Sequence, residues 1–176
     1  MQKNKNFIDI IMPNYNKGAY IEEAIQSVIK QSYKYWKLYI IDDFSNDFSR
    51  KVLKKFKKNK KIKVIFLKKN RGPSFCRNMG ISLSKSPFIS FLDSDDYWPK
   101  NKLLLQLNFM IKQKINFSYT DYISFFKENK KKFLKSTNIQ NELNLKTFVR
   151  NSSINTSTMI LKKEIIKNIK FKNLKK

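Results

Sequence analysis

The chain has 176 residues, of which 41% are hydrophobic, enough for a domain that buries about 70% of its unfolded surface. Histidine is absent and cysteine occurs once, which excludes Ser-His-Asp and Cys-His catalysis, histidine-bound zinc and an internal disulfide. No apolar run approaches the roughly 18 residues of a membrane span, and none follows the N-terminal lysines as a signal peptide would require, so we expect a cytoplasmic protein.

The formal net charge of +25 suggests a nucleic-acid partner, because a basic surface attracts phosphate backbones. The lysines, however, are spread over nearly every polar position. The densest run, residues 51–63, is interrupted by Val52, Leu53 and Phe56 at helical spacing, which predicts the wet face of an amphipathic helix. We therefore expect no nucleic-acid partner, and expect peripheral contact with anionic lipids at the inner face of the cell membrane, where each well-placed lysine contributes about 1 kcal/mol.

Short apolar runs alternate with helical stripes over the first two thirds of the chain. Strands are predicted where apolar runs end at turn residues or acids, at residues 8–11, 38–41, 62–67 and 88–92. Helices are predicted at residues 20–31, 46–58 and 73–84, and from Pro99 onward. The last helix has an expected apolar face of Leu103, Leu104, Leu107, Met110 and Ile111. This alternation predicts an α/β fold, with a mostly parallel sheet and helices on both faces.

The pattern weakens after residue 115. Residues 116–126 are predicted as one extended strand with Asp121 inside it, residues 133–136 and 156–161 are strand-like, and residues 142–150 are predicted as a helix. No internal repeat and no linker rich in Gly or Pro divides the chain. We expect a single domain over residues 1–176.

Acidic and turn residues follow several of the predicted strands. Ligands of open parallel sheets bind beyond the carboxyl ends of the strands, a rule that places residues 13–16, 42–43, 71–74 and 93–96 on one edge. Carboxylates as close as Asp93, Asp95 and Asp96 raise one another's pKa unless a cation or strong donors neutralise them. Oxygen ligands two positions apart suit Mg²⁺ or Mn²⁺. The alternative is a solvated acidic turn.

The same edge offers groups for a nucleotide. Asp43 can accept a hydrogen bond from a base or ribose, Tyr15 can stack on a base, and Arg77 can neutralise phosphates. Structural roles stay open for all three: a helix N-cap, a core aromatic and an internal salt bridge. Neither a Gly-x-Gly-x-x-Gly motif after the first strand nor a Walker lysine motif is present. The groups therefore predict a nucleotide-linked substrate whose leaving diphosphate is stabilised by a metal.

Four motifs carry a resemblance to a known family. They are IIMPNYN at residues 10–16, IIDDFSND at 40–47, NRGPSFCRNMG at 70–80 and FLDSDDYW at 91–98. In this order they resemble the signatures of family 2 glycosyltransferases with the GT-A fold, and residues 156–160 resemble a later stretch more loosely. The resemblance implies a nucleotide-sugar-binding part at residues 7–126 and an incomplete acceptor-side part at residues 127–176.

The resemblance also implies roles for individual residues. The expected nucleotide-binding residues are Pro13, Tyr15, Asp42, Asp43, Arg77, Asp93 and Ser94, and the expected metal ligands are Asp93 and Asp95 of an Asp-x-Asp motif. Asp95 would lie nearest the metal. For Asp42, holding the turn is as open a role as touching the ligand. Phe44 stands where the family usually has glycine.

The implied activity is that of a hexosyltransferase-like enzyme. It would move a sugar from a nucleotide-diphosphate sugar to a glycan or lipid-linked acceptor in cell-surface glycan synthesis, by inversion with Mg²⁺ or Mn²⁺. The family usually places its catalytic base in an acidic motif after a strand such as residues 156–161, but Glu164 is the only acid after Leu161.

We therefore expect the chain to end before that base, as a fragment or a shortened reading frame. Asp121 is the internal candidate for a catalytic residue. Two alternatives stay open: a catalytically silent sugar-nucleotide-binding fragment, and a basic nucleic-acid-binding domain.

Overall fold

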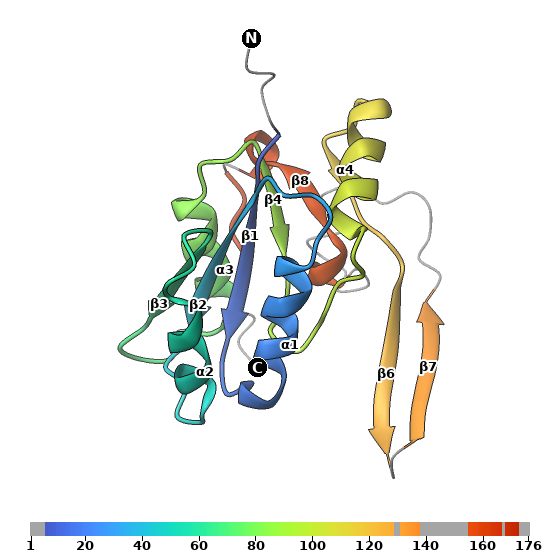
Figure 1. The fold of residues 1–176 in the computed structure, drawn as a ribbon. Helices are drawn as coiled ribbons and strands as arrows, with labels where there is room; N and C mark the ends of the chain where they lie inside the picture. Colours follow the sequence, from blue (N-terminus) through green and yellow to red (C-terminus); the bar gives the residue numbers. More distant parts are fainter. Residues whose placement is uncertain (1–5, 129–130, 138–154, 167, 173–176) are drawn as a thin grey trace.

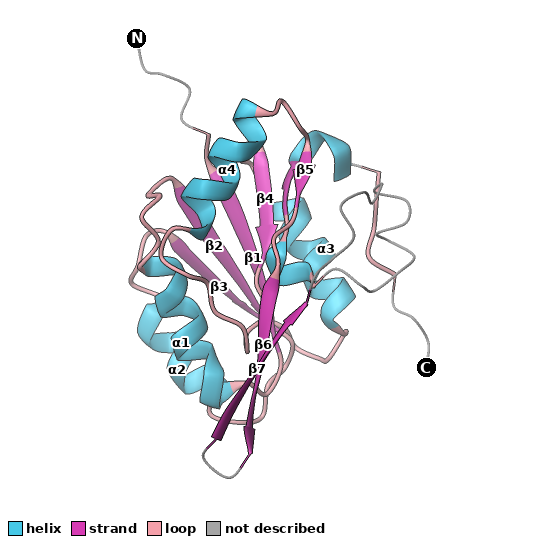
Figure 2. Ribbon diagram, turned by 90° about the vertical axis from the view of Figure 1, so that its right-hand side faces the viewer, coloured by secondary structure: helices cyan, strands magenta, loops and turns pink. Residues whose placement is uncertain are grey.

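The computed structural model describes residues 6–128, 131–137, 155–166 and 168–172. A six-stranded sheet of order β3-β2-β1-β4-β8-β5 has helices on both faces, and strands β6 and β7 pair with each other outside that sheet (Figures 1 and 2). The predicted α/β class is thereby confirmed. Within this part of the chain no helix has the length and apolar character that crossing a bilayer requires.

The first four strands run parallel to one another. They are β1 (Ile8–Asn14), β2 (Trp36–Asp42), β3 (Ile62–Phe66) and β4 (Phe88–Phe91). The helices between and after them are α1 (Gly18–Ile29), α2 (Ser49–Phe56), α3 (Pro73–Leu83) and α4 (Lys102–Lys112). Each lies close to its predicted range, since apolar periodicity is a strong signal for elements of this length.

Side chains of β1 enter two separate cores. Ile10 and Met12 pack in a cluster with residues of α1, α2 and α4, whereas Ile11 packs in a cluster with Cys76 of α3. All seven residues of β1 are buried. Burial on both faces explains why β1 is a nearly continuous apolar run instead of an alternating one.

Strand β8 (Ile160–Lys162) lies between β4 and β5 (Phe117–Ser118) and runs antiparallel to both. The strand-like stretch 156–161 is in fact a 3₁₀ turn, η1 (Thr156–Thr158), followed by this short strand. The turn forms because Asn155 accepts hydrogen bonds from the backbone of Ser157 and the hydroxyl of Thr158. As a result, the residues that precede β8 lie at the carboxyl end of β4.

The stretch predicted as one strand at residues 116–126 is divided, so that prediction is wrong. Beyond Ser118 the sheet offers β5 no further partner, because β8 begins at Ile160, opposite Ser118. The chain leaves the sheet there and forms β6 (Tyr122–Glu128), which pairs with β7 (Lys131–Thr137). Asp121 is exposed between β5 and β6, and the predicted helix at 142–150 lies outside the described residues.

The buried face of α4 differs in part from the expected one. Ile111 is 47% exposed, and Lys102 and Gln106 are buried instead. Gln106 donates hydrogen bonds to the hydroxyl of Ser118 and the carbonyl of Thr158. These bonds turn the side of α4 that carries Gln106 toward β5 and η1. The Lys102 amine lies 4.1 Å from the centroid of the Trp98 ring, and burial lowers its pKa well below the ordinary value. A final short turn, η2 (Lys163–Ile166), follows β8.

Gly80 allows α3 to approach β1 closely. A Cβ at this position would lie 2.3 Å from Cγ2 of the buried Ile11. We expect Gly80→Ala to lower the free energy of unfolding by about 1–3 kcal/mol, the usual cost of overpacking. Urea unfolding measures the change, with the exposed Ser82→Ala on the same helix as control. Combination with Ile11→Ala should be less than additive; strict additivity would refute this contact as the cause.

Candidate active site

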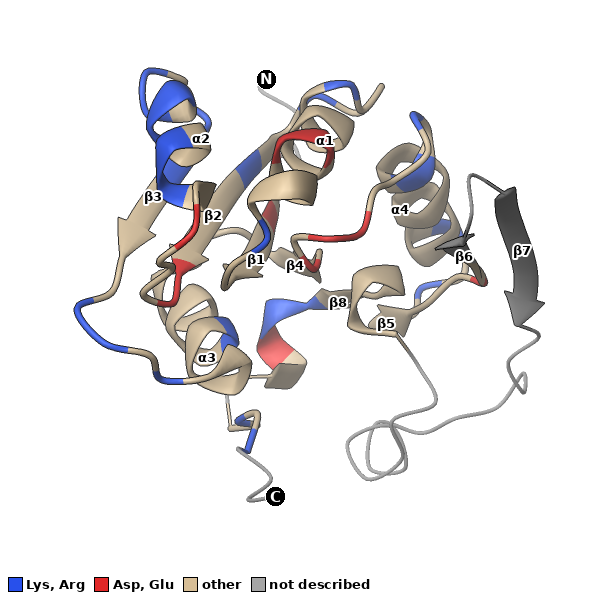
Figure 3. Cartoon of the chain, turned by 90° about the horizontal axis from the view of Figure 1, so that it is seen from below, with Lys and Arg blue, Asp and Glu red and all other residues tan. Residues whose placement is uncertain are grey.

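The carboxyl ends of β1, β2 and β4 meet at one edge of the sheet, and the predicted site residues gather there. Figure 3 looks onto this edge and shows acidic segments next to the ends of β2 and β4. The structure brings together Pro13 and Tyr15 from the first motif, Asp42 and Asp43 from the second, Arg77 of α3, and Asp93, Ser94 and Asp95 after β4. Pro13 and Ser94 are buried there.

Asp42 joins β1, β2 and α2 from a fully buried position. Its Oδ1 accepts a hydrogen bond from Nδ2 of Asn14 at 2.8 Å. Its Oδ2 accepts bonds from Nε of Arg50 at 2.8 Å and from the backbone of Ser45 at 3.3 Å. Both oxygens are therefore engaged inside the protein, as the turn-holding alternative requires.

Asp43 fixes the loop that leads into α3. Its carboxylate accepts hydrogen bonds from the backbone N–H groups of Arg71, at 2.7 Å, and Gly72, at 2.8 Å. Gly72 has a φ of 84°, a left-handed conformation that glycine adopts without strain. Asp43 thus fixes the start of α3, the helix that carries Arg77.

Phe44 has a φ of 65°, the conformation for which glycine would be suited. A non-glycine residue there carries a strain of about 1–2 kcal/mol. The Phe44 ring is 48% exposed, and its centroid lies 5.4 Å from the guanidinium carbon of Arg50. Phe44 therefore holds a conformation suited to glycine although it carries a large side chain.

Tyr15 lies at the rim of the edge and is 47% exposed, which excludes the core-aromatic alternative. The next residue, Asn16, holds the turn with a φ of 51°. Its backbone N–H donates to the hydroxyl of Ser45 at 3.0 Å, and its side chain accepts from the backbone of Asn46 at 2.9 Å. The Tyr15 ring is therefore presented to solvent on a turn fixed from both sides.

Asp93 is held by groups from two distant parts of the chain. Its Oδ1 accepts from Nη2 of Arg77 at 2.6 Å, and its Oδ2 accepts from the hydroxyl of Thr156 at 3.2 Å. Its backbone N–H donates to the hydroxyl of Ser157 at 3.0 Å. Arg77 also keeps a buried Nε without an acceptor among the described residues. Arg77 thus forms the internal salt bridge that was the alternative to phosphate binding, and its Nε is left as a further hydrogen-bond donor.

Asp95 forms an ion pair with Lys17, whose Nζ lies 2.7 Å from Oδ2, and both side chains are 41% exposed. The hydrogen bond to Asp95 raises the pKa of Lys17. Burial, and repulsion from the carboxylates of Asp93 and Asp95, raise the pKa of Asp96. Hydrogen bonds from Ser157 and Asn155 lower this pKa but do not outweigh the burial. Each acid of this turn therefore has its own partner, and no three metal-ligating side chains converge in the described part of the chain.

Asp121, the predicted catalytic residue, lies on this side of the sheet, whereas the Cys76 thiol is unsuited to catalysis. Asp121 follows β5, and because β4 and β5 are both antiparallel to β8, their carboxyl ends point to the same edge. Asp121 is exposed there. Cys76 is fully buried, and burial raises the pKa of its thiol to about 12, which excludes a thiolate nucleophile at neutral pH.

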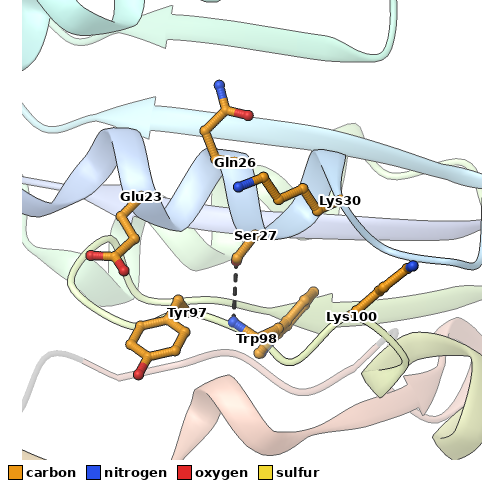
Figure 4. A pocket seen from close by; sticks show the side chains of 7 residues that line it. All are labelled: Glu23, Gln26, Ser27, Lys30, Tyr97, Trp98 and Lys100. Carbon is orange, nitrogen blue, oxygen red and sulfur yellow. Dashed lines mark hydrogen bonds between the residues drawn. The ribbon is translucent and has the colours of Figure 1, made fainter.

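An open cleft of about 430 Å³ lies beside this edge, between α1 and the loop after β4 (Figure 4). Glu23, Tyr97 and Trp98 are among its lining residues. The hydroxyl of Ser27 accepts a hydrogen bond from the backbone of Trp98 at 3.1 Å and joins its two walls. None of the predicted site residues lines this cleft, so it is separate from the candidate site.

Sequence patterns alone indicate no role for Lys17, Thr156 or Ser157. Lys17, however, comes directly after the first motif, so a cation at the end of the first strand was a usable signal. Thr156 and Ser157 reach Asp93 only because β8 inserts next to β4. No local sequence pattern predicts the insertion of β8 beside β4.

Asp47 links the starts of α1 and α2. Its two oxygens accept from the backbone of Gly18 at 2.8 Å and of Ser49 at 2.9 Å. Burial alone would raise the Asp47 pKa, but hydrogen bonds from Ser49 and Gly18 outweigh it and lower the pKa below 3.8. Because the folded pKa lies below the unfolded one, the stabilisation is present above the unfolded pKa and is lost as pH falls through the folded pKa.

We therefore expect Asp47→Asn to lower the free energy of unfolding by about 1 kcal/mol at neutral pH, because the amide keeps one acceptor oxygen and loses the hydrogen bond made by the other. The difference from wild type should stay constant above about pH 5 and shrink below it. Urea unfolding at several pH values tests this, with the exposed Glu23→Gln as control. A difference that does not change with pH would argue against the charged form as the source.

The sequence profile described as Glycosyl transferase family 2 matches residues 9–170. TuaG of Bacillus subtilis, a candidate glycosyltransferase of teichuronic acid biosynthesis, is 32% identical over 172 residues, which cover 97% of this chain and 68% of TuaG. WfgD of Escherichia coli, a UDP-Glc:alpha-D-GlcNAc-diphosphoundecaprenol beta-1,3-glucosyltransferase, is 39% identical over 115 residues, 65% of this chain and 45% of WfgD.

Two solved structures share the fold. Staphylococcus aureus TarS 1–349 in complex with UDP-GlcNAc has a TM-score of 0.71 at 24% identity and covers 92% of this chain and 47% of its own. The mannosyltransferase PcManGT of Pyrobaculum calidifontis, in complex with GDP-Man and Mn²⁺, has a TM-score of 0.68 at 14% identity. That match covers 92% of this chain and 46% of PcManGT. The present chain therefore spans about half the length of these structures.

Proposed function

The chain belongs to glycosyl transferase family 2 and has the GT-A fold, and from this premise we propose that it binds a nucleotide-diphosphate sugar at the edge formed by β1, β2 and β4. The observation that carries the proposal is the half-exposed carboxylate of Asp95, which lies beside the Asp93–Arg77 pair at the end of β4. The nucleotide-sugar part would be residues 7–126 and the acceptor-side part residues 127–176.

In this proposal the nucleoside lies against the exposed ring of Tyr15, next to Pro13 and Asp43. The diphosphate lies between Arg77 and Lys17, whose cationic groups suit phosphate oxygens. Asp93 and Ser94 lie beneath it. Asp42, whose oxygens are both engaged, supports this edge from behind.

The residues also fit the divalent ion that the family resemblance implies. Asp95 is half exposed and already holds a cation, the amine of Lys17, whereas Asp93 is engaged by Arg77 and Thr156. Mg²⁺ or Mn²⁺ would therefore be held mainly by Asp95, with Asp93 beside it, the remaining ligands coming from the diphosphate. When bound, the ion would neutralise the departing nucleoside diphosphate.

We propose an inverting transfer to the hydroxyl of a lipid-linked or glycan acceptor in cell-surface glycan synthesis, at the cytoplasmic face of the membrane. The substrates named for WfgD support the lipid-linked class. Calorimetric titration with UDP, with and without Mn²⁺, tests donor binding. Release of free UDP from UDP-glucose in the presence of acceptor tests turnover, and metal-dependent binding without turnover would instead favour the catalytically silent fragment.

Asp121 is the proposed general base on the acceptor side, because it is exposed and follows β5 at the site edge. We expect Asp121→Asn to lower turnover about 100-fold or more, the usual contribution of a general base. Binding of UDP should change by less than about twofold, since the nucleotide edge is untouched. Unchanged turnover would remove Asp121 from the mechanism, and the exposed Glu164→Gln is the matched control.

A further inference from the structure

Helix α4 carries an apolar surface that nothing in the described part of the chain covers. Leu105 is 66% exposed, and Phe109, one turn further along the same side of the helix, is 52% exposed. The opposite side of the helix is anchored in the core by Leu103, Leu107 and Met110. The exposed side chains are therefore a fixed feature of a firmly packed helix and do not result from fraying.

The charged residues of α4 and of its flanking segments are all basic. The exposed lysines Lys100, Lys112 and Lys114 lie at the two ends of α4, and residues 97–120 contain no Asp or Glu. Figure 3 shows lysine segments on α4 and no acidic one, whereas α1 carries acidic residues. We call these three lysines together with Leu105 and Phe109 the α4 face.

We propose that the α4 face docks on an anionic lipid bilayer, with its apolar side chains in the interfacial region and its lysines on lipid phosphates. A second copy of the chain would bring the same lysines against each other on a molecule of net charge +25, which opposes self-association through this face. An anionic bilayer offers the complementary charge together with an apolar layer.

This inference rests on the proposed function in one respect, because a lipid-linked acceptor would lie in such a bilayer. The loop after β4 connects Asp95 with the start of α4. Docking through α4 would therefore hold the candidate site near the membrane surface, where an acceptor hydroxyl becomes available.

Co-sedimentation with vesicles tests the proposal. Wild-type protein should bind vesicles of phosphatidylcholine and phosphatidylglycerol and should not bind vesicles of phosphatidylcholine alone. Leu105→Ser with Phe109→Ser should lower the partition coefficient about tenfold or more, because two large apolar side chains lose their burial. Lys112→Gln with Lys114→Gln should also lower it about tenfold or more.

The matched control is Lys54→Gln with Lys58→Gln, which removes the same charge from exposed positions on and just after α2. Its effect should be smaller, at most about threefold, because these lysines lie outside the α4 face. Equal losses in both lysine pairs, with no effect of the Leu105 and Phe109 changes, would overturn the proposal in favour of non-specific charge attraction. Self-association that the Leu105 and Phe109 changes abolish, seen by analytical ultracentrifugation, would assign the face to a second copy.

Circular dichroism and urea unfolding verify that the variants fold. Calorimetry with UDP separates this proposal from the donor-site proposal, because α4 variants that lose vesicle binding should still bind UDP. A wild-type protein that binds vesicles but no nucleoside diphosphate would refute the donor site alone.

Discussion

Asp95→Asn is expected to abolish metal-dependent binding of a nucleoside diphosphate. Asp95 is the half-exposed acid of the turn after β4, and the amine of Lys17 shows that a cation is accommodated at its oxygen. Loss of an outer-shell partner already lowers metal affinity about 10–100-fold, so loss of the ligand itself should lower it at least 100-fold. Titration with UDP in the presence and absence of Mn²⁺ measures the effect.

Lys17→Gln is the matched comparison, because it removes the ion pair but leaves the Asp95 carboxylate. An exposed ion pair contributes about 0–1 kcal/mol, so direct Mn²⁺ binding, measured by electron paramagnetic resonance without nucleotide, should be unchanged or up to about fivefold tighter. Equal Mn²⁺ dependence in wild type and Asp95→Asn would exclude Asp95 as a ligand. Loss of Mn²⁺ binding in Lys17→Gln would mean that the ion pair itself shapes the site.

Arg50→Ala is expected to lower the free energy of unfolding by about 2–3 kcal/mol, because it leaves the fully buried carboxylate of Asp42 without its cation. The estimate lies below the range for fully buried pairs, since the Arg50 side chain is 34% exposed. The change also removes a hydrogen bond to the carbonyl of Leu67 at 3.0 Å. Urea denaturation followed by circular dichroism measures the loss.

Two further variants isolate the cause. Lys51→Ala, at the exposed neighbouring position, should change stability by less than about 0.5 kcal/mol. Adding Asp42→Asn to Arg50→Ala should recover part of the loss, because a neutral amide can stay buried at lower cost than an unpaired carboxylate. If the double variant is no more stable than Arg50→Ala, the unpaired charge is not the reason for the loss.

Several features of the site could be predicted because they depend on local pattern. The apolar run of β1 and the stripe of α1 define their own elements, and the acids after β2 and β4 mark the strand ends. The φ of 65° at Phe44, in contrast, is not predicted by the residue type, because phenylalanine rarely adopts that conformation. Exposure of Tyr15 and Asp95 likewise required the packed structure.

Predictions from sequence pattern fail where pairing between segments far apart in the chain determines the local structure. Residues 116–126 have the composition of one strand, yet β5 ends at Ser118 because its partner begins at Ile160. Residues 102 and 106 are polar and would be assigned to solvent, yet they are buried on α4, where Gln106 bonds to Thr158 and Lys102 lies over Trp98. Periodicity describes one element at a time and contains no information on which neighbour that element will meet.

The sequence by itself determined the order of the motifs and thereby the edge of the sheet at which Asp43, Arg77 and Asp93 meet, because alternating strands and helices bring the carboxyl ends of parallel strands together. Only the tertiary structure decided the partner of each carboxylate. Asp42 pairs with Arg50, Asp93 with Arg77, and Asp95 with Lys17. The insertion of β8 beside β4, which brings Thr156 to Asp93, depends on backbone hydrogen bonds between segments about 70 residues apart, and residue spacing does not encode such bonds.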